Sequence, residues 1–197
     1  MKRLLTTLVI LTGLFAPALA VAGEGVNIDD LVKREGVFYK KFTEELFTGK
    51  TTGQEQSTFR RGKKHGLSVW YHENGQLSWK GTYKDGKSEG PSVSYHANGQ
   101  LSSKGTYKDG EREGPYVWYY PNGQLSWKGT YKDDKKHGPS VSYHENGQLS
   151  QKGTYKDDKR EGPWVFYNED GTTDFDGKCC SWHKGSGTYR NGKKVSD

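Results

Sequence analysis

Cysteine, methionine and long apolar runs are scarce in this chain. Of its 197 residues, 2 are cysteine, 1 is methionine and 30% are hydrophobic. The two cysteines, Cys179 and Cys180, are adjacent and could bond to each other only through a strained ring, since disulfides prefer Cα atoms about 5.5–6 Å apart. A disulfide framework is therefore excluded, and we expect two free thiols or a bridge between chains.

A large excess of charge of one sign is also missing. The chain has 30 basic and 24 acidic residues, and the signs alternate along it, as in Lys84-Asp85 and Lys108-Asp109. A nucleic-acid-binding protein gathers basic residues on one face. We therefore interpret the charge as a solvated surface and expect no nucleic-acid partner.

The first 22 residues have the composition of an export signal. Lys2 and Arg3 precede an apolar stretch at 4–15, and two small-x-small triplets follow, ending at Ala20 and Ala22. The apolar stretch is shorter than the roughly 20 residues that cross a membrane. We expect cleavage after one of these triplets and a periplasmic or secreted protein; an uncleaved N-terminal anchor is the alternative.

Repeats account for most of the remaining sequence. Two series of glycines recur every 24 residues: Gly66, Gly90, Gly114, Gly138, Gly162 and Gly75, Gly99, Gly123, Gly147, Gly171. A 48-residue period is superimposed, because the first and third units carry tryptophan at two positions where the second and fourth carry Ser94, Ser103, Ser142 and Gln151. Partial units at 57–65 and 187–193 flank the array, as is common for terminal repeats.

Each unit is expected to form two strands and two turns. Residues 91–95 alternate small polar with apolar side chains, Asn98-Gly99 is a strong hairpin signal, and Asp109-Gly110 leads into the next unit. Residues 27–34, outside the array, have the one helical pattern. We divide the chain into a signal peptide (1–22), an N-terminal cap (23–56), the repeats (57–177) and a C-terminal partial repeat (178–197). The segments before Phe59 and after Phe175 should cover the edge strands.

The length of the Asn-Gly loop decides which residues share a face. A two-residue turn pairs Trp70 with Trp79. A three-residue loop, a type I turn followed by a left-handed glycine, pairs Tyr71 with Leu77 and Val69 with Trp79. Proline is favoured at the first central position of a type I turn, and the third unit has Pro121 there. We therefore expect the three-residue loop, with Val69, Tyr71, Leu77 and Tyr83 on one face.

The pattern G-x-Y-x-x-G-x-x-x-G-x-x-x-x-Y-x-x-N-G-x-L, from Gly81 to Leu101, resembles the MORN-repeat variant of bacterial YwqK-type proteins, which are often labelled antitoxins. The resemblance covers roughly residues 47–193. It implies an all-β fold, a tandem β-hairpin (MORN-like) array that forms an elongated antiparallel meander. It also implies a scaffold or a binding module for protein or lipid.

No group of residues indicates catalysis. His72, His96 and His144 recur at one repeat position, but equivalent positions lie two strands apart, about 9.6 Å, which is too far to share a metal ion. We interpret them as exposed residues beside turns. The carboxylates of Glu89 and Glu113 also repeat, whereas catalytic groups are usually singular. We expect no enzyme, no metal and no cofactor.

The aromatic residues carry the most information about a partner. We expect the repeated tyrosines to form the core, because aromatic rings bury large areas. Trp70 and Trp118 alternate with Ser94 and Ser142, so we place them on the face opposite the core as candidate partner-binding residues. The favoured hypothesis is an exported protein-binding or scaffold module. An antitoxin or immunity protein, or binding of cell-wall glycan or lipid, are the alternatives; the oligomeric state stays open.

Overall fold

The computed structural model describes residues 25–174 and 185–196. Strands account for nearly all of its regular structure, beside one short 3₁₀ turn, η1 (Ile28–Asp30). The strands are β1 (Val26–Asn27), β2 (Leu31–Arg34), β3 (Val37–Lys40), β4 (Gly49–Thr52), β5 (Glu55–Arg60), β6 (Lys63–Tyr71), β7 (Leu77–Lys84), β8 (Lys87–Ser88), β9 (Gly90–Tyr95), β10 (Leu101–Lys108), β11 (Glu111–Arg112), β12 (Gly114–Tyr119), β13 (Leu125–Lys132), β14 (Lys135–Tyr143), β15 (Leu149–Lys156), β16 (Lys159–Phe166), β17 (Gly187–Arg190) and β18 (Lys193–Ser196).

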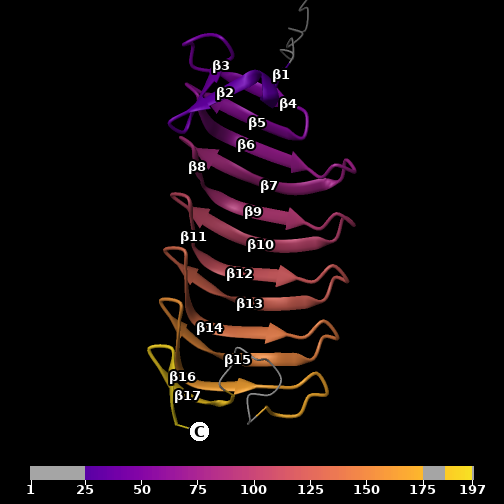
Figure 1. Cartoon of the computed structure of the whole chain (residues 1–197), viewed down its shortest axis with the longest axis vertical. Coiled ribbons are helices and arrows are strands. Elements are labelled where there is room, and N and C mark those ends of the chain that lie inside the picture. Colours follow the sequence, from indigo (N-terminus) through magenta and orange to yellow (C-terminus); the bar gives the residue numbers. More distant parts are fainter. Residues whose placement is uncertain (1–24, 175–184, 197) are drawn as a thin grey trace, which may run out of the picture.

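One long sheet contains every strand except β2 and β3. From β4 onward its neighbours follow the order of the chain and pair antiparallel, so that the hairpins stack along one axis (Figure 1). The short strands β8 and β11 pair with β7 and β10 beside this path. The all-β antiparallel meander that the repeats predict is confirmed for the described residues.

The three-residue loop is also confirmed. In the first unit the N–H of Gly75 donates to the carbonyl of His72 over 2.9 Å, and the N–H of His72 donates to Gln76 over 2.8 Å. Gly75 has φ +80°, the left-handed conformation that the third loop position requires. Tyr71 consequently pairs with Leu77, and Tyr95 with Leu101 in the second unit.

The expected pairing beyond this point is wrong. A register shift follows the Tyr71–Leu77 pair, so that Trp70 lies opposite Trp79 and Val69 opposite Lys80. The physical cause is a β-bulge, which places an extra residue in the return strand and shifts the pairing by one. A three-residue loop followed by a bulge therefore produces the Trp70–Trp79 pairing that we had assigned to the two-residue turn.

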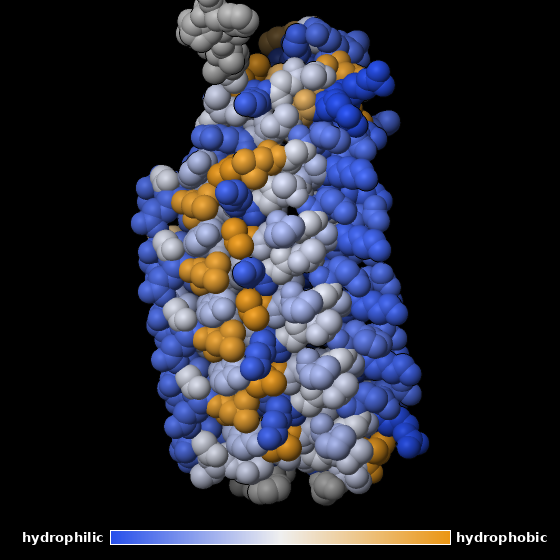
Figure 2. Space-filling view, turned by 180° about the vertical axis from the view of Figure 1, so that it is seen from behind, coloured by the Kyte–Doolittle hydropathy of each residue, from blue (hydrophilic) through white to orange (hydrophobic). Residues whose placement is uncertain are grey.

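The sheet has two chemically different faces. On the face that we call aliphatic, Val69, Tyr71, Leu77 and their equivalents are half-buried. Figure 2 shows a row of hydrophobic residues that runs along the molecule. On the other, which we call the aromatic face, lie Trp79, Tyr83 and their equivalents, with ring centroids 5.8 Å apart in the first unit. Tyr83 was expected with Val69, but the bulge places it on the aromatic face.

The buried side chains of the repeats lie on the aromatic face. They form two clusters, Tyr116–Trp127–Tyr131 and Trp164–Phe166–Tyr189. Small buried serines such as Ser68 and Ser92 share this face with them. Trp70 and Trp118 also lie here, so the expectation that they stand opposite the core is wrong.

Further strands continue the repeat sheet at both ends. At the N-terminal end, Leu31, Phe47 and Phe59 form a buried cluster with Phe38 against it. β1 extends the sheet by pairing parallel to β4, and residues 27–34 form η1 and β2 in place of the expected helix. At the other end the β17–β18 hairpin pairs with β16. Residues 1–24, 175–184 and 197, including the proposed signal, Phe175 and both cysteines, lie outside the described residues.

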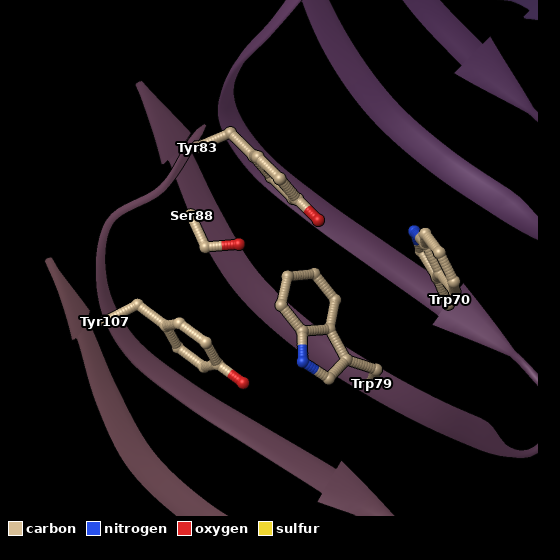
Figure 3. Close-up of a pocket in the computed structure, with 5 residues that line it drawn as sticks. All are labelled: Trp70, Trp79, Tyr83, Ser88 and Tyr107. Carbon is tan, nitrogen blue, oxygen red and sulfur yellow. The ribbon is translucent and has the colours of Figure 1, made fainter. Parts of the chain in front are cut away.

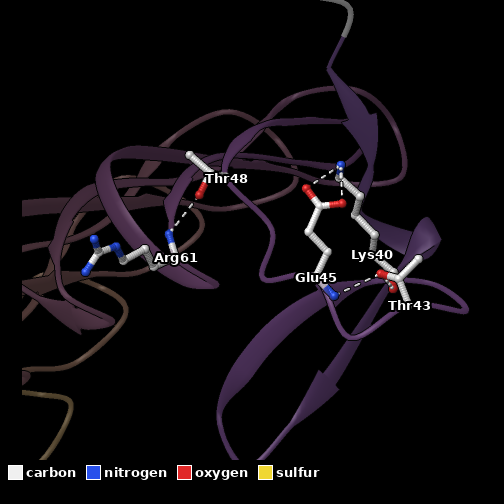
Figure 4. Close-up of polar contacts among 5 residues, drawn as sticks. All are labelled: Lys40, Thr43, Glu45, Thr48 and Arg61. Atoms are coloured by element: carbon white, nitrogen blue, oxygen red, sulfur yellow. Dashed lines mark hydrogen bonds and ion pairs between the residues drawn. The ribbon is translucent and has the colours of Figure 1, made fainter.

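Polar contacts hold the N-terminal cap to the first turn of the array (Figure 4). The ammonium group of Lys40 lies 2.9 Å from both carboxylate oxygens of Glu45, whose own N–H donates to Thr43 Oγ1 over 3.1 Å. The N–H of Arg61, in the β5–β6 turn, donates to Thr48 Oγ1 over 2.9 Å. The first two contacts are internal to the cap, and the bond between Arg61 and Thr48 joins the cap to the β5–β6 turn.

Candidate functional site

The strand glycines of the repeats lie beneath aromatic rings. In the first unit the ring of Trp79 covers Gly81 of the same strand, and a Cβ at Gly81 would stand 2.5 Å from that ring. In the second unit Tyr116, which comes from the neighbouring strand, covers Gly105. Glycine is required at these positions because the ring occupies the space of a side chain.

The 48-residue period follows from which strand supplies the ring. Trp127 covers Gly129 from its own strand, and its Nε1 donates to Ser140 Oγ on the next strand over 2.8 Å. In the fourth unit Gln151 replaces this tryptophan, and Trp164 covers Gly153 from across the strand pair. One ring therefore covers each of these glycines, from the glycine's own strand in the first and third units and from the next strand in the second and fourth. This explains why Trp79 and Trp127 alternate with Ser103 and Gln151.

Trp70 and Trp118 form an outer layer on the rings that cover the glycines. Trp118 is half-buried, with its centroid 4.9 Å from that of Trp127. Trp70 stands 6.0 Å from Trp79 and remains 40% exposed. The structure thus brings the two candidate residues to equivalent places in different packing environments, and Trp70 is the more accessible.

Basic side chains lie over the rings at one position of the repeat, two residues before the repeat glycine, which we call the cation position. Each of four cations lies over the tyrosine that pairs with the repeat glycine two residues later, with distances to the ring centroid of 4.1–5.3 Å; the pairs are Lys64–Tyr83, Arg112–Tyr131, Lys136–Tyr155 and Arg160–Tyr189. Such contacts stabilise by about 0.5–1 kcal/mol when exposed and more when desolvated. Burial lowers the pKa of Lys136.

A hollow of about 270 Å³ opens on the aromatic face of the first unit (Figure 3). It is lined by Trp70, Trp79, Tyr83, Ser88 and Tyr107, from β6, β7, β8 and β10. The side chain of Ser88 points into the space between the two tyrosine rings. Burial, together with its neighbour Tyr116, raises the pKa of Tyr107 well above the ordinary value, so this hydroxyl stays neutral at physiological pH.

The repeated histidines are half-buried, and this corrects the expectation of exposed side chains. Nε2 of His72, His96 and His144 each lies 2.8–2.9 Å from the carbonyl oxygen of a tyrosine one repeat later. Because a carbonyl accepts, Nε2 is the donor. In the third unit the hydroxyl of Tyr120 makes the same bond to Tyr143 over 2.8 Å. These residues join successive hairpins.

The repeated carboxylates bind neighbouring turns. Glu89 Oε2 accepts the N–H of Asp109 over 2.9 Å, and Glu113 Oε2 accepts that of Asp133 over 3.2 Å. Within 25–174 and 185–196, no three His, Cys, Asp or Glu side chains gather in a group that could hold a metal ion. In the same ranges no helix has the length and apolar character needed to cross a membrane.

We did not predict the cation position from the sequence. The signal is present, because the residues two places before the repeat glycines are Lys64, Ser88, Arg112, Lys136 and Arg160. Basic residues alternate with acidic ones throughout the chain, so this series looks like ordinary surface charge until the fold places it on the rings. Its interruption at Ser88 coincides with the hollow.

A family model described as the MORN repeat variant matches four successive stretches, residues 64–85, 88–109, 112–133 and 136–157. Each stretch begins at a cation position and covers most of one repeat. No curated protein matches the chain.

Proposed function

We propose that this chain, which contains four tandem MORN repeat variants, is an exported, non-catalytic module that binds a partner protein on its aromatic face. MORN repeats are typically protein- or membrane-binding modules. A long regular sheet with rigid aromatic side chains on one face suits such a role, because tryptophan and tyrosine are enriched among the residues that dominate binding energy.

Trp70 is the observation that carries this proposal. The chain folds with serine at the same position in the second and fourth units, Ser94 and Ser142, yet it exposes 40% of a tryptophan here, beside a hollow. A large aromatic side chain that is partly exposed next to a hollow is a typical anchor for a partner. Trp118 occupies the equivalent position but contributes more to packing, since it lies 4.9 Å from Trp127.

Support for a non-catalytic role comes from what the polar residues do. The histidines, such as His96, and the carboxylates, such as Glu89, are engaged with backbone groups of the next repeat. Catalytic acids and bases are usually held singly in a cleft. Support for export comes from the apolar stretch and the small-x-small triplets of the first 22 residues.

The narrower antitoxin or immunity role, which the resemblance to YwqK-type proteins implies, is one form of this proposal. In that form the partner is a toxin met outside the cytoplasm. Binding of cell-wall glycan through exposed tryptophan is a competing function, and retention of the protein on purified peptidoglycan would favour it over a protein partner.

Site-specific photo-crosslinking tests the proposal. An aromatic photo-crosslinking amino acid with a benzophenone side chain replaces Trp70 on the aromatic face, so that a ring remains at the anchor position, or, as a matched control, Leu67 on the aliphatic face of the same strand. Both positions are on β6 and are 40% and 49% exposed. In the native envelope we expect a discrete protein adduct from position 70 and none from position 67. Mass spectrometry of the exported chain should also show a mature N-terminus at Val21 or Gly23.

Substitution provides the second measurement. Trp70→Ser should lower the melting temperature less than Trp118→Ser does, because Trp70 is the more exposed ring, and should weaken partner binding by about 2 kcal/mol or more, about 30-fold in Kd. Leu67→Ser should change neither. Trp118→Ser should lower the melting temperature, because the ring packs on Trp127. An adduct from position 67 alone, or full binding by Trp70→Ser, would contradict the assignment of the aromatic face.

A further inference from the structure

Ser88 interrupts the series of cations on the aromatic face. It precedes Gly90 by two residues, as the four basic side chains precede their own repeat glycines. Tyr107 pairs with Gly90 across the strands, so it takes the place of the tyrosines that receive a cation elsewhere. At this one of the five positions the chain therefore supplies a short hydroxyl side chain in place of a cation.

Lys136, 48 residues later, shows what the full arrangement looks like. Its ammonium group lies 5.1 Å from the centroid of Trp127, 5.9 Å from Trp118 and 5.2 Å from Tyr155. The residues 48 places earlier are Ser88, Trp79, Trp70 and Tyr107, and all four line the hollow. The hollow thus corresponds to the place that Lys136 occupies in the third unit. The same three rings surround it, and a serine replaces the lysine.

The shape of the hollow agrees with this correspondence. The rings of Trp70 and Trp79 lie 6.0 Å apart at a tilt of 59°, and Tyr83 lies 5.8 Å from Trp79. The Tyr107 ring stands on the far side of Ser88 from Tyr83 (Figure 3). Several ring faces and edges around one open space form the kind of aromatic cage that attracts a cation through the ring quadrupoles.

A cation already present nearby does not exclude a second one. Lys64 lies 4.8 Å from the centroid of Trp70 and 5.2 Å from that of Tyr83. Arg112 lies 4.1 Å from Tyr131, the counterpart of Tyr83, and Lys136 is accommodated beside it all the same. Two neighbouring cations are therefore accommodated around the rings of the third unit of this chain.

The hollow and the place of Lys136 differ in their acidic neighbours. The charge of Asp158 favours the protonated form of Lys136, and the residue 48 places earlier is Gly110. A cation in the hollow would meet the rings without this carboxylate. A small ammonium compound should consequently bind weakly, whereas a protein partner can add contacts along the rest of the aromatic face.

We infer that the hollow binds the ammonium group of a lysine side chain from a partner protein, in the place that Lys136 occupies in the third unit. This inference rests on the proposed function, because it specifies the chemistry of the partner at the aromatic face. Lysine is chosen over other cations because the one side chain of this chain that occupies the equivalent space is a lysine.

The test is an NMR titration that follows the indole N–H signals of Trp70 and Trp79. The probe is Nα-acetyl-lysine amide, and its control is Nα-acetyl-norleucine amide, which has a similar aliphatic stem without the charge. We expect saturable shifts at both indoles with the lysine compound and none at matched concentration with the norleucine compound. Equal shifts with both would overturn the inference, because they would indicate an apolar hollow. Tighter binding of choline would overturn the assignment to lysine.

Two variants of the protein sharpen the test. Ser88→Lys places a lysine of the chain itself in the hollow; it should raise the melting temperature and weaken probe binding about tenfold or more. Lys136→Ser removes the lysine from the third unit; it should create a second site, reported by new shifts at the Trp118 and Trp127 indoles. Unchanged probe binding by Ser88→Lys, or absence of a second site in a folded Lys136→Ser protein, would overturn the inference.

Failure of this inference can be distinguished from failure of the proposed function. A protein that forms its adduct from position 70 but does not bind the lysine compound retains the partner-binding role and loses the lysine assignment. A protein that binds the lysine compound but forms no envelope adduct retains the cage and loses the proposed partner protein. Each result therefore decides one of the two claims.

Discussion

Removing the ring of Trp127 should be compensated by placing a ring on the neighbouring strand. Trp127 covers Gly129 and donates to Ser140 Oγ. In the second unit Ser103 stands at the position of this tryptophan, and Tyr116 from the neighbouring strand covers Gly105. The double variant Trp127→Ser with Ser140→Tyr converts the third unit to this second arrangement.

The single changes should each be destabilising. Trp127→Ser removes a 5% exposed ring and opens a cavity over the glycine, which should cost about 3–5 kcal/mol of the free energy of unfolding. Ser140→Tyr alone forces two rings toward one glycine and should cost about 1–3 kcal/mol through overpacking. In the double variant the new tyrosine fills the cavity, so we expect a loss of no more than about 2 kcal/mol relative to the native chain.

Urea denaturation followed by far-UV circular dichroism measures the four proteins of this cycle. The expected result is that the double variant is more stable than Trp127→Ser by about 2 kcal/mol. The matched control is Trp127→Ser with Ser142→Tyr, in which the new ring stands at the position equivalent to Trp118 and should not restore stability. Additive losses in the Ser140→Tyr cycle would refute the exchange of rings as the reason for the 48-residue period.

Two further changes test other contacts. Asp134 forms an ion pair with Arg112. The hydrogen bond from Arg112 is the main cause that lowers the pKa of the Asp134 carboxyl group below its ordinary 3.8. The stabilising effect of this ion pair should therefore be present at neutral pH and lost as the pH falls below about 4. Thermal melts should show that Asp134→Asn is destabilised by about 1 kcal/mol or less at pH 7 and that this deficit shrinks as the pH falls below about 4; a deficit that does not change with pH would contradict the stabilising role of the ion pair. His96→Ala should lose about 1 kcal/mol of stability, because the carbonyl of Tyr119 loses its donor, while partner capture in the crosslinking assay stays intact. Loss of capture by a folded His96→Ala protein would instead place this histidine in the binding surface.

The repeat period, the strand composition and the loop could be predicted because each depends on local chemistry. Glycine at the third loop position must adopt positive φ, and Gly75 does so. The Pro121 argument for a three-residue loop led to the correct Tyr71–Leu77 pair. These features are encoded within a few neighbouring residues, so one sequence suffices to recognise them.

The assignment of faces depended on a feature that the sequence does not mark. The β-bulge after Leu77 comes from how one strand fits its neighbour, and it moves every residue from Trp79 to Tyr83 relative to the face that alternation predicts. The bulge brings Trp79 and Tyr83 onto the face of Trp70. That face lies opposite Val69 and Tyr71, as expected, but it is the face that buries the rings.

The sequence by itself determined the array of hairpins, its period and its two flanking partial units, since turn residues and alternation act over short distances. The tertiary structure decided which face buries the rings, which strand supplies the ring over each glycine, and where the series of cations meets the aromatic side chains. Those outcomes join residues on different strands, from 11 positions apart in Gly105 and Tyr116 to 19 in Lys136 and Tyr155 or Ser88 and Tyr107. Strand register and the competition between rings for one space determine these contacts, and neither exists until the strands pair.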